Sequence, residues 1–304
     1  MNKLWPWFIT ILIISGIFVI INTAGNTRAE KTIEAQSTDI SGPKGNCAIS
    51  LPEQLDFAGE MVALEQWDVA EHLDRELLVN TYWHSSTIRI IKLANRWLPL
   101  IESILKKQGI PDDFKYLAIA ESGLQNVVNS AGATGFWQFM PKTGREYNLR
   151  ISSEIDQRYD VEASTRAACV YLKDAYKKFH SWTLAAASYN MGQGRLNQSL
   201  ENQQVDSYYD LYLNTETSRY VFRILAFKLI LSNPSKYGFC FDETDLYNPI
   251  AFKKFTLDHS IEDLAVFAKE QQTNLKMLKL LNPWIRKNKL TLQEGESLEL
   301  SLPA

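Results

Sequence analysis

Residues 111–123 read Pro-Asp-Asp-Phe-Lys-Tyr-Leu-Ala-Ile-Ala-Glu-Ser-Gly, a stretch with the start and stop signals of a helix. Proline opens it, two acids occupy its first turn, and glycine closes it. Phe114, Leu117 and Glu121 are three and four residues apart, so they share one face of the helix. The sequence therefore predicts a short helix that turns the carboxylate of Glu121 toward an apolar core.

A carboxylate on an apolar face is costly unless it is paired or keeps its proton. Glu121 also lies near the C-terminal, negative end of the helix dipole, which favours the neutral form. Both effects predict a raised pKa, as a general acid at neutral pH requires. The alternative is a glutamate that reaches solvent at a frayed helix end, and this stretch leaves both open.

The composition is that of a globular protein with a sizeable core. The chain has 304 residues, of which 45% are hydrophobic, and a net charge of −3, which fits one or two domains and gives no support to nucleic-acid binding. Aromatic residues could stack on sugar rings or fill a helical core. The four histidines are scattered and no Cys/His cluster has metal-ligand spacing, so we expect no metal site and no cofactor.

An apolar run from Leu4 to Ile21 follows Lys3 and has the length of a signal-peptide core or a short membrane span. Residues 1–24 are therefore predicted to be a signal peptide or a retained membrane anchor, and the polar residues 25–50 a linker. Either alternative places the rest of the chain outside the cytoplasm, in the periplasm or cell envelope. The odd number of cysteines, Cys47, Cys169 and Cys240, allows one disulfide and one free thiol.

Residues 51–232 show helical periodicity and no β-alternation, which predicts an all-α domain. Residues 233–254 are irregular and are expected to connect this domain to a small module, residues 255–304, built as strand, two helices and strand. The helices expected in the larger domain, besides the first stretch, lie around 69–77, 88–105 with Pro99 as a kink or a break, 160–179, 182–191, and from 218 to 233.

After Gly123 the chain becomes rich in small residues, from Asn129 to Gly135, and then large and apolar up to Pro141. Such a loop is typical of an active site, because glycines allow the backbone to approach a ligand, but it also fits a buried turn. Gln138 is an amide among large apolar residues. Buried amides need hydrogen-bond partners, which the hydroxyl or acetamido group of a sugar could supply.

Four stretches now combine in order: Glu-Ser-Gly at 121–123, Gly-Ala-Thr-Gly-Phe-Trp-Gln-Phe-Met-Pro at 132–141, Ala-Ser-Tyr-Asn-Met-Gly at 187–192, and Arg-Tyr-Val at 219–221. They resemble the four motifs of the soluble-lytic-transglycosylase family, part of the goose-lysozyme-like superfamily. The resemblance covers roughly residues 90–232. It implies a mainly α fold, with a lysozyme-like helical catalytic domain and a small α+β C-terminal module.

The family resemblance implies cleavage of the β-1,4 bond between N-acetylmuramic acid and N-acetylglucosamine in peptidoglycan glycan strands, leaving a 1,6-anhydro end. Most glycosidases need two carboxylates. A transglycosylase can use one, since the acetamido group and 6-hydroxyl of the sugar act as nucleophiles, so Glu121 would serve as acid and then as base. Tyr220 would hydrogen-bond near it. The substrate-binding residues implied are Ser122, Gln138, Phe139, Met140, Tyr189, Asn190 and Tyr220.

The C-terminal module resembles a LysM peptidoglycan-binding module, most clearly in Leu278–Pro283. It lacks the usual Gly-Asp-Thr turn, in whose place Asp258-His259-Ser260 stands, so glycan binding by the module is left open. All four motifs precede Pro234. The module is therefore expected to be separable from the chemistry.

Two other functions fit the same motifs. A goose-type lysozyme would hydrolyse the same bond and needs a second acid, for which the candidates by sequence proximity are Glu146, Glu154, Asp156 and Asp160. A wall-binding scaffold would use the same surfaces without chemistry, although a pure binder has no need of an inward-facing acid.

Overall fold

The computed structural model describes residues 48–304, and all of them belong to one compact unit. The predicted signal peptide or anchor, nearly all of the predicted linker and Cys47 lie outside the described residues. Within the described part, no helix combines the length and apolarity needed to cross a membrane. Cys169 is a buried free thiol and Cys240 an exposed one.

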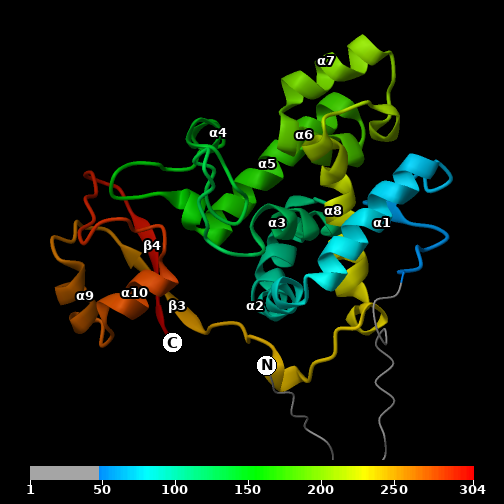
Figure 1. Ribbon diagram of the computed structural model, residues 1–304. Coiled ribbons are helices and arrows are strands. Elements are labelled where there is room, and N and C mark those ends of the chain that lie inside the picture. The colour runs from blue at the N-terminus through cyan, green and yellow to red at the C-terminus, as the bar shows by residue number, and fades with distance from the viewer. Residues whose placement is uncertain (1–47) are drawn as a thin grey trace, which may run out of the picture. The chain divides into compact units, whose positions relative to one another are not determined.

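The larger part of the structure is helical, which confirms the predicted fold class (Figure 1). Its helices are α1 (Trp67–Tyr82), α2 (His84–Gln108), α3 (Lys115–Ser122), α4 (Pro141–Glu146), α5 (Val161–Phe179), α6 (Trp182–Met191), α7 (Gln193–Gln203) and α8 (Thr215–Ser232).

Helix α3 is the predicted helix of the first stretch, and it packs against α2 and α8. Its first turn is tighter than expected, because Asp112–Phe114 form a 3-10 turn before the α-helix begins. Gly123 ends the helix with φ 59°, in the left-handed region that glycine tolerates best. Phe114 and Leu117 are fully buried, so the predicted apolar face is the one that meets the core.

Three features of the helical part differ from the sequence-based expectation. Of the two alternatives for Pro99, a kink or a break, the break is wrong, because α2 is continuous through this residue. The region expected to be all-α contains a small hairpin, β1 (Asp56–Phe57) and β2 (Glu60–Met61), whose two-residue strands are too short to show alternation. Helices α4 and α7 were not expected; α7 buries only Leu196, so it has almost no periodic apolar face to detect.

The C-terminal module has the predicted order of strand, two helices and strand. Strand β3 (Phe252–Leu257) pairs antiparallel with β4 (Leu298–Pro303), and α9 (Leu264–Glu270) and α10 (Leu275–Leu281) lie between them in the chain (Figure 1). Asp263 caps α9, because its Oδ1 accepts the backbone N–H groups of the first turn.

The C-terminal module shares its core with a residue of the helical part. Its buried core includes Ile155, which is 0% exposed and comes from the chain between α4 and α5. The connection 233–254 is also held to the helical part: the carbonyl of Tyr247 accepts a bond from Asn95 (3.2 Å), and the carbonyl of Asn248 accepts one from Arg96 (3.0 Å).

Candidate active site

Glu121 lies in the last turn of α3, where its side chain is half-buried. The hydroxyl of Tyr220, from the buried face of α8, donates a hydrogen bond to its Oε1. The carboxyl group on the apolar face of α3 and the tyrosine of the Arg-Tyr-Val motif of α8 thus meet in the folded chain. The predicted proximity of these two residues is a feature of the structure.

The surroundings of Glu121 raise its pKa to about 7 from an ordinary 4.5. The largest cause is burial, which disfavours the charged form. The hydrogen bond from Tyr220 and the positive charge of Arg223 act in the opposite direction, and the negative charge of Glu216 adds to the rise. Near neutral pH the group can therefore hold a proton and release it.

Tyr189, from the end of α6, lies near enough to Glu121 and Tyr220 to interact with both electrostatically, and the three side chains form a cluster from three helices. Its hydroxyl donates to the carbonyl oxygen of Trp137 at 2.8 Å. Burial raises its pKa well above the usual value, and the negative charge of Glu121 adds to this. The pKa of Tyr220 is raised well above its usual value by the same two causes. Both phenols therefore stay protonated, and remain hydrogen-bond donors, over the pH range in which Glu121 titrates.

The loop of residues 132–140, called the glycine-rich loop below, lies next to this cluster through Trp137. Gln138 has φ 48°, and its Nε2 donates to the carbonyls of Gly135 (2.8 Å) and Val127 (3.1 Å). The amide nitrogen of Gln138 therefore has backbone partners within the protein, one in the glycine-rich loop and one in the segment before it. Sequence reasoning missed them because both are backbone groups whose position depends on the loop conformation.

The other site residues predicted from the motifs occupy different environments. The ring of Phe139 is 3% exposed and packs edge to face on Tyr189, with centroids 5.9 Å apart, so it supports the site from the core. Met140 is 40% exposed. Ser122 donates to the carbonyl of Ala118 within α3, and Asn190 is half-buried at the end of α6.

A buried ion-pair cluster beside the site escaped the sequence reasoning. Glu76 of α1 is 1% exposed, its Oε1 lies 2.6 Å from Nε of Arg219, and its Oε2 lies 3.6 Å from Nε of Arg223. The available signal was spacing: Glu76 shares the apolar face of α1 with Leu73 and Leu77. The two arginines are one turn apart on the helix that carries Tyr220.

The four acids considered for a hydrolase have other partners in the structure. These partners are Arg158 for Asp156, the backbone N–H of Ala163 for Asp160, the backbone N–H of Thr291 for Glu154, and Lys142 for Glu146. The carboxylate whose charge acts on Glu121 is instead that of Glu216, exposed in the first turn of α8. Within residues 48–304, no group of three or more potential ligands is placed to hold a metal ion.

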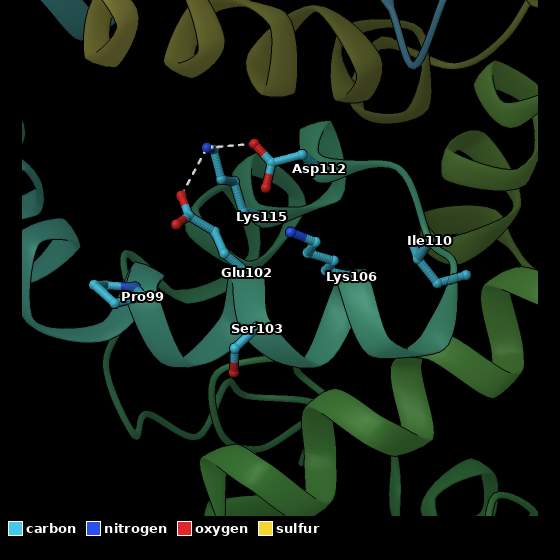
Figure 2. A pocket seen from close by; sticks show the side chains of 7 residues that line it. All are labelled: Pro99, Glu102, Ser103, Lys106, Ile110, Asp112 and Lys115. Atoms are coloured by element: carbon cyan, nitrogen blue, oxygen red, sulfur yellow. Dashed lines mark hydrogen bonds and ion pairs between the residues drawn. The ribbon is translucent and has the colours of Figure 1, made fainter.

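A groove of about 630 Å³ opens elsewhere, between α2 and the start of α3 (Figure 2). Lys115 lies on it and forms ion pairs with Glu102 (2.7 Å) and Asp112 (2.6 Å), shown as dashed lines in Figure 2. Burial would lower the pKa of this lysine, but the two carboxylates raise it above its usual value. None of its lining residues belongs to the cluster around Glu121.

Comparison with known families agrees with the motifs. Residues 99–211 match the model described as the transglycosylase SLT domain, and residues 253–304 match the soluble lytic transglycosylase C-terminal LysM-like domain. The chain thus combines a transglycosylase SLT domain with a LysM-like domain.

Among individual proteins, the chain is homologous to membrane-bound lytic murein transglycosylase D of Escherichia coli K12. The two are 33% identical over 183 residues, which make up 58% of this chain and 40% of the relative. The protein of the same name from Escherichia coli O6:H1 matches to the same extent. The chain thus spans 40% of the length of these relatives. A solved structure of an inactive mutant of lytic transglycosylase Slt from Pseudomonas aeruginosa is similar at 20% identity and a TM-score of 0.40, over 60% of this chain and 34% of that one.

Proposed function

We propose that this protein is a peptidoglycan lytic transglycosylase. It cleaves the β-1,4 bond between N-acetylmuramic acid and N-acetylglucosamine and leaves a 1,6-anhydro-N-acetylmuramic acid end. The observation that carries the proposal is the environment of Glu121, a half-buried carboxyl group with a pKa raised to about 7 and a phenol bonded to it. The SLT domain match and the four motifs support the substrate class.

In the first step, neutral Glu121 donates its proton to the glycosidic oxygen, and the bond from that oxygen to the muramic acid C1 breaks. The acetamido group of the same sugar stabilises C1 from the opposite side. In the second step, the resulting carboxylate of Glu121 accepts the proton of the 6-hydroxyl. The oxygen of that hydroxyl forms the bond to C1 and closes the 1,6-anhydro ring. A pKa near the working pH suits one group that performs both transfers.

The neighbouring side chains support these proton transfers. Tyr220 bonds to Glu121 in both states, and its bond favours the charged form that the second step needs. Tyr189 is held by the glycine-rich loop and, with Gln138 and Asn190, orients the sugar. Ser122 and Met140 flank the substrate, while Phe139 supports Tyr189 from behind.

The test is mass analysis of the muropeptides released from purified peptidoglycan. Wild type should release products with anhydro ends, and Glu121→Gln should lose about 10²-fold to 10⁴-fold in rate or more, since the amide has no acidic proton to give. The matched control is Glu146→Gln, an exposed glutamate that pairs with Lys142 at 3.9 Å, which should keep wild-type turnover. Wild-type turnover by Glu121→Gln would refute the assignment.

A goose-type lysozyme hydrolase is the second candidate, and one observation favours it. Glu216 acts electrostatically on Glu121 and is exposed, so it could serve as the second acid that activates water. Hydrolysis would be established if wild type released reducing ends in place of anhydro ends and Glu216→Gln lost this activity. A scaffold without catalysis predicts no release of either product.

The partners and location follow from the same function. Peptidoglycan glycan strands are the proposed substrate, which places the protein in the cell envelope, in the periplasm. Attachment to the membrane depends on whether the apolar segment near the N-terminus, outside the described residues, is cleaved. Fractionation of cells that express the tagged full chain would separate the two outcomes.

A further inference from the structure

The C-terminal module rests on a segment of the helical part, residues 150–158, called the docking segment below. Ile155 is fully buried in the core of the module and pairs with Ile285 as an antiparallel bridge. The backbone N–H of Asp156 donates to the carbonyl of Trp284 at 2.8 Å. An apolar side chain and backbone hydrogen bonds therefore join the two parts, as they would within one domain.

Side-chain contacts surround this bridge. The carboxylate of Glu154 accepts the backbone N–H of Thr291 (2.9 Å) and lies 3.4 Å from Nζ of Lys289, while its carbonyl accepts the N–H of Arg286 at 2.7 Å. The guanidinium of Arg286 lies 4.0 Å from the ring centre of Tyr159, the residue that directly follows the docking segment. These contacts use residues on both sides, which fixes the orientation of the docking segment on the module.

The docking segment ends in a buried ion pair that reaches the glycine-rich loop. The carboxylate of Asp156 binds Arg158 with both oxygens, at 3.0 Å from Nε and 2.7 Å from Nη2. The remaining nitrogen of Arg158, Nη1, donates to the carbonyls of Gly132 (2.9 Å) and Phe139 (3.1 Å). The guanidinium therefore joins the two ends of the glycine-rich loop, and Asp156 fixes its plane.

The backbone of the glycine-rich loop lies directly on the same arginine. A Cβ at Gly135 would come within 1.9 Å of the carbonyl oxygen of Arg158, so only glycine allows this approach. Within the same loop, the carbonyl of Trp137 accepts the hydrogen bond of the Tyr189 hydroxyl. Tyr189 is one of the side chains around Glu121. A continuous series of contacts thus runs from the module to the side chains around the carboxyl group.

We propose that the C-terminal module positions the active site: by binding residues 150–158, it holds Asp156 and Arg158 where they order the glycine-rich loop. Arg158 is a positioning residue in this scheme. The claim that the module orders the glycine-rich loop does not depend on which reaction the protein catalyses. The claim that this ordering affects turnover rests on the proposed function. The scheme requires no glycan on the module, which fits the departure at Asp258-His259-Ser260.

The test is hydrogen–deuterium exchange of the full-length protein, read at the amides of residues 132–140. Ile155→Ala removes the contact inside the module core and should speed exchange there by about tenfold or more. Ile155→Val keeps most of that contact and should restore slow exchange. The matched control is Ile104→Ala in α2, a buried isoleucine of the helical core. Exchange in residues 132–140 is compared between this control and Ile155→Ala after each rate is corrected for the loss of global stability.

Arg158→Lys is the second variant, because Ile155→Ala could unfold the module. Lysine keeps the charge but lacks the planar fork that bonds one carboxylate and two carbonyls together. Exchange should rise in residues 132–140 and stay unchanged in residues 252–304. On a short soluble glycan, both variants should lower kcat by more than they raise KM, because binding surfaces outside the loop are intact.

The outcomes distinguish this inference from the proposed function. Unchanged exchange in residues 132–140 in both variants would overturn the inference, whatever the activity of wild type. Faster loop exchange together with no lytic activity in wild type would keep the structural coupling and reject only the proposed function.

Discussion

Replacing Glu121 by glutamine should remove a pH-dependent loss of stability from the folded protein. The carboxyl group has a pKa of about 7 in the folded state and an ordinary value of 4.5 when exposed. Below pH 4.5 it is protonated in both states and does not affect the balance. As pH rises from 4.5, the unfolded chain releases this proton first, so wild type loses stability until the folded group also ionises at about pH 7.

The size of the effect follows from the two pKa values. At about 1.4 kcal/mol for each pH unit, their difference corresponds to an upper bound of about 3.5 kcal/mol in the free energy of unfolding. The amide in Glu121→Gln does not titrate, so the variant should gain this amount relative to wild type between pH 4.5 and about 7, with no further gain above. The amide nitrogen also needs an acceptor, which lowers the gain equally at every pH.

Urea melts of both proteins across this pH range measure the effect. The informative quantity is the change with pH in the difference between variant and wild type, because the constant cost of the amide cancels from it. In Glu146→Gln, which alters an exposed ion pair, the free energy of unfolding should stay within about 0.5 kcal/mol of wild type. A difference that falls from acid to neutral pH would show that Glu121 is a paired, ionised carboxylate, and the account of its proton would be wrong.

Further predictions concern the residues that support the site. Gly135→Ala should cost at least about 2 kcal/mol in urea melts, since its φ is 85° and its Cβ would meet a backbone oxygen, whereas Gly194→Ala, in α7 with open space around it, should be neutral or gain up to about 1 kcal/mol. Tyr220→Phe removes a bond that lowers the pKa of Glu121, so the carboxyl titration followed by NMR should move upward; a downward move would contradict the assignment. Glu60→Ala removes the carboxylate that accepts the first N–H groups of α6 and should cost about 1–2 kcal/mol in the same melts, and an unchanged midpoint would mean that water replaces it.

Local signals in the sequence determined most of the secondary structure. The Pro and Gly at the ends of residues 111–123, the spacing of their apolar residues and the four motifs predicted α3, α6 and α8, and they supplied the candidate residues of the site. These features act within one or two turns of chain, so they can be read without knowing the fold. The same applies to the order of elements in the C-terminal module.

The tertiary structure alone decided which groups meet. The bond from Tyr220 to Glu121, the burial of Glu76 beside two arginines and the insertion of Ile155 into the module join residues far apart in the chain. Gln138 shows the same limit at short range, because its partners are carbonyls in a loop with a left-handed residue. Apolar periodicity shows which face of a helix is buried, but the partner of a polar group depends on how the helices pack, because a hydrogen bond needs its two atoms within about 3 Å.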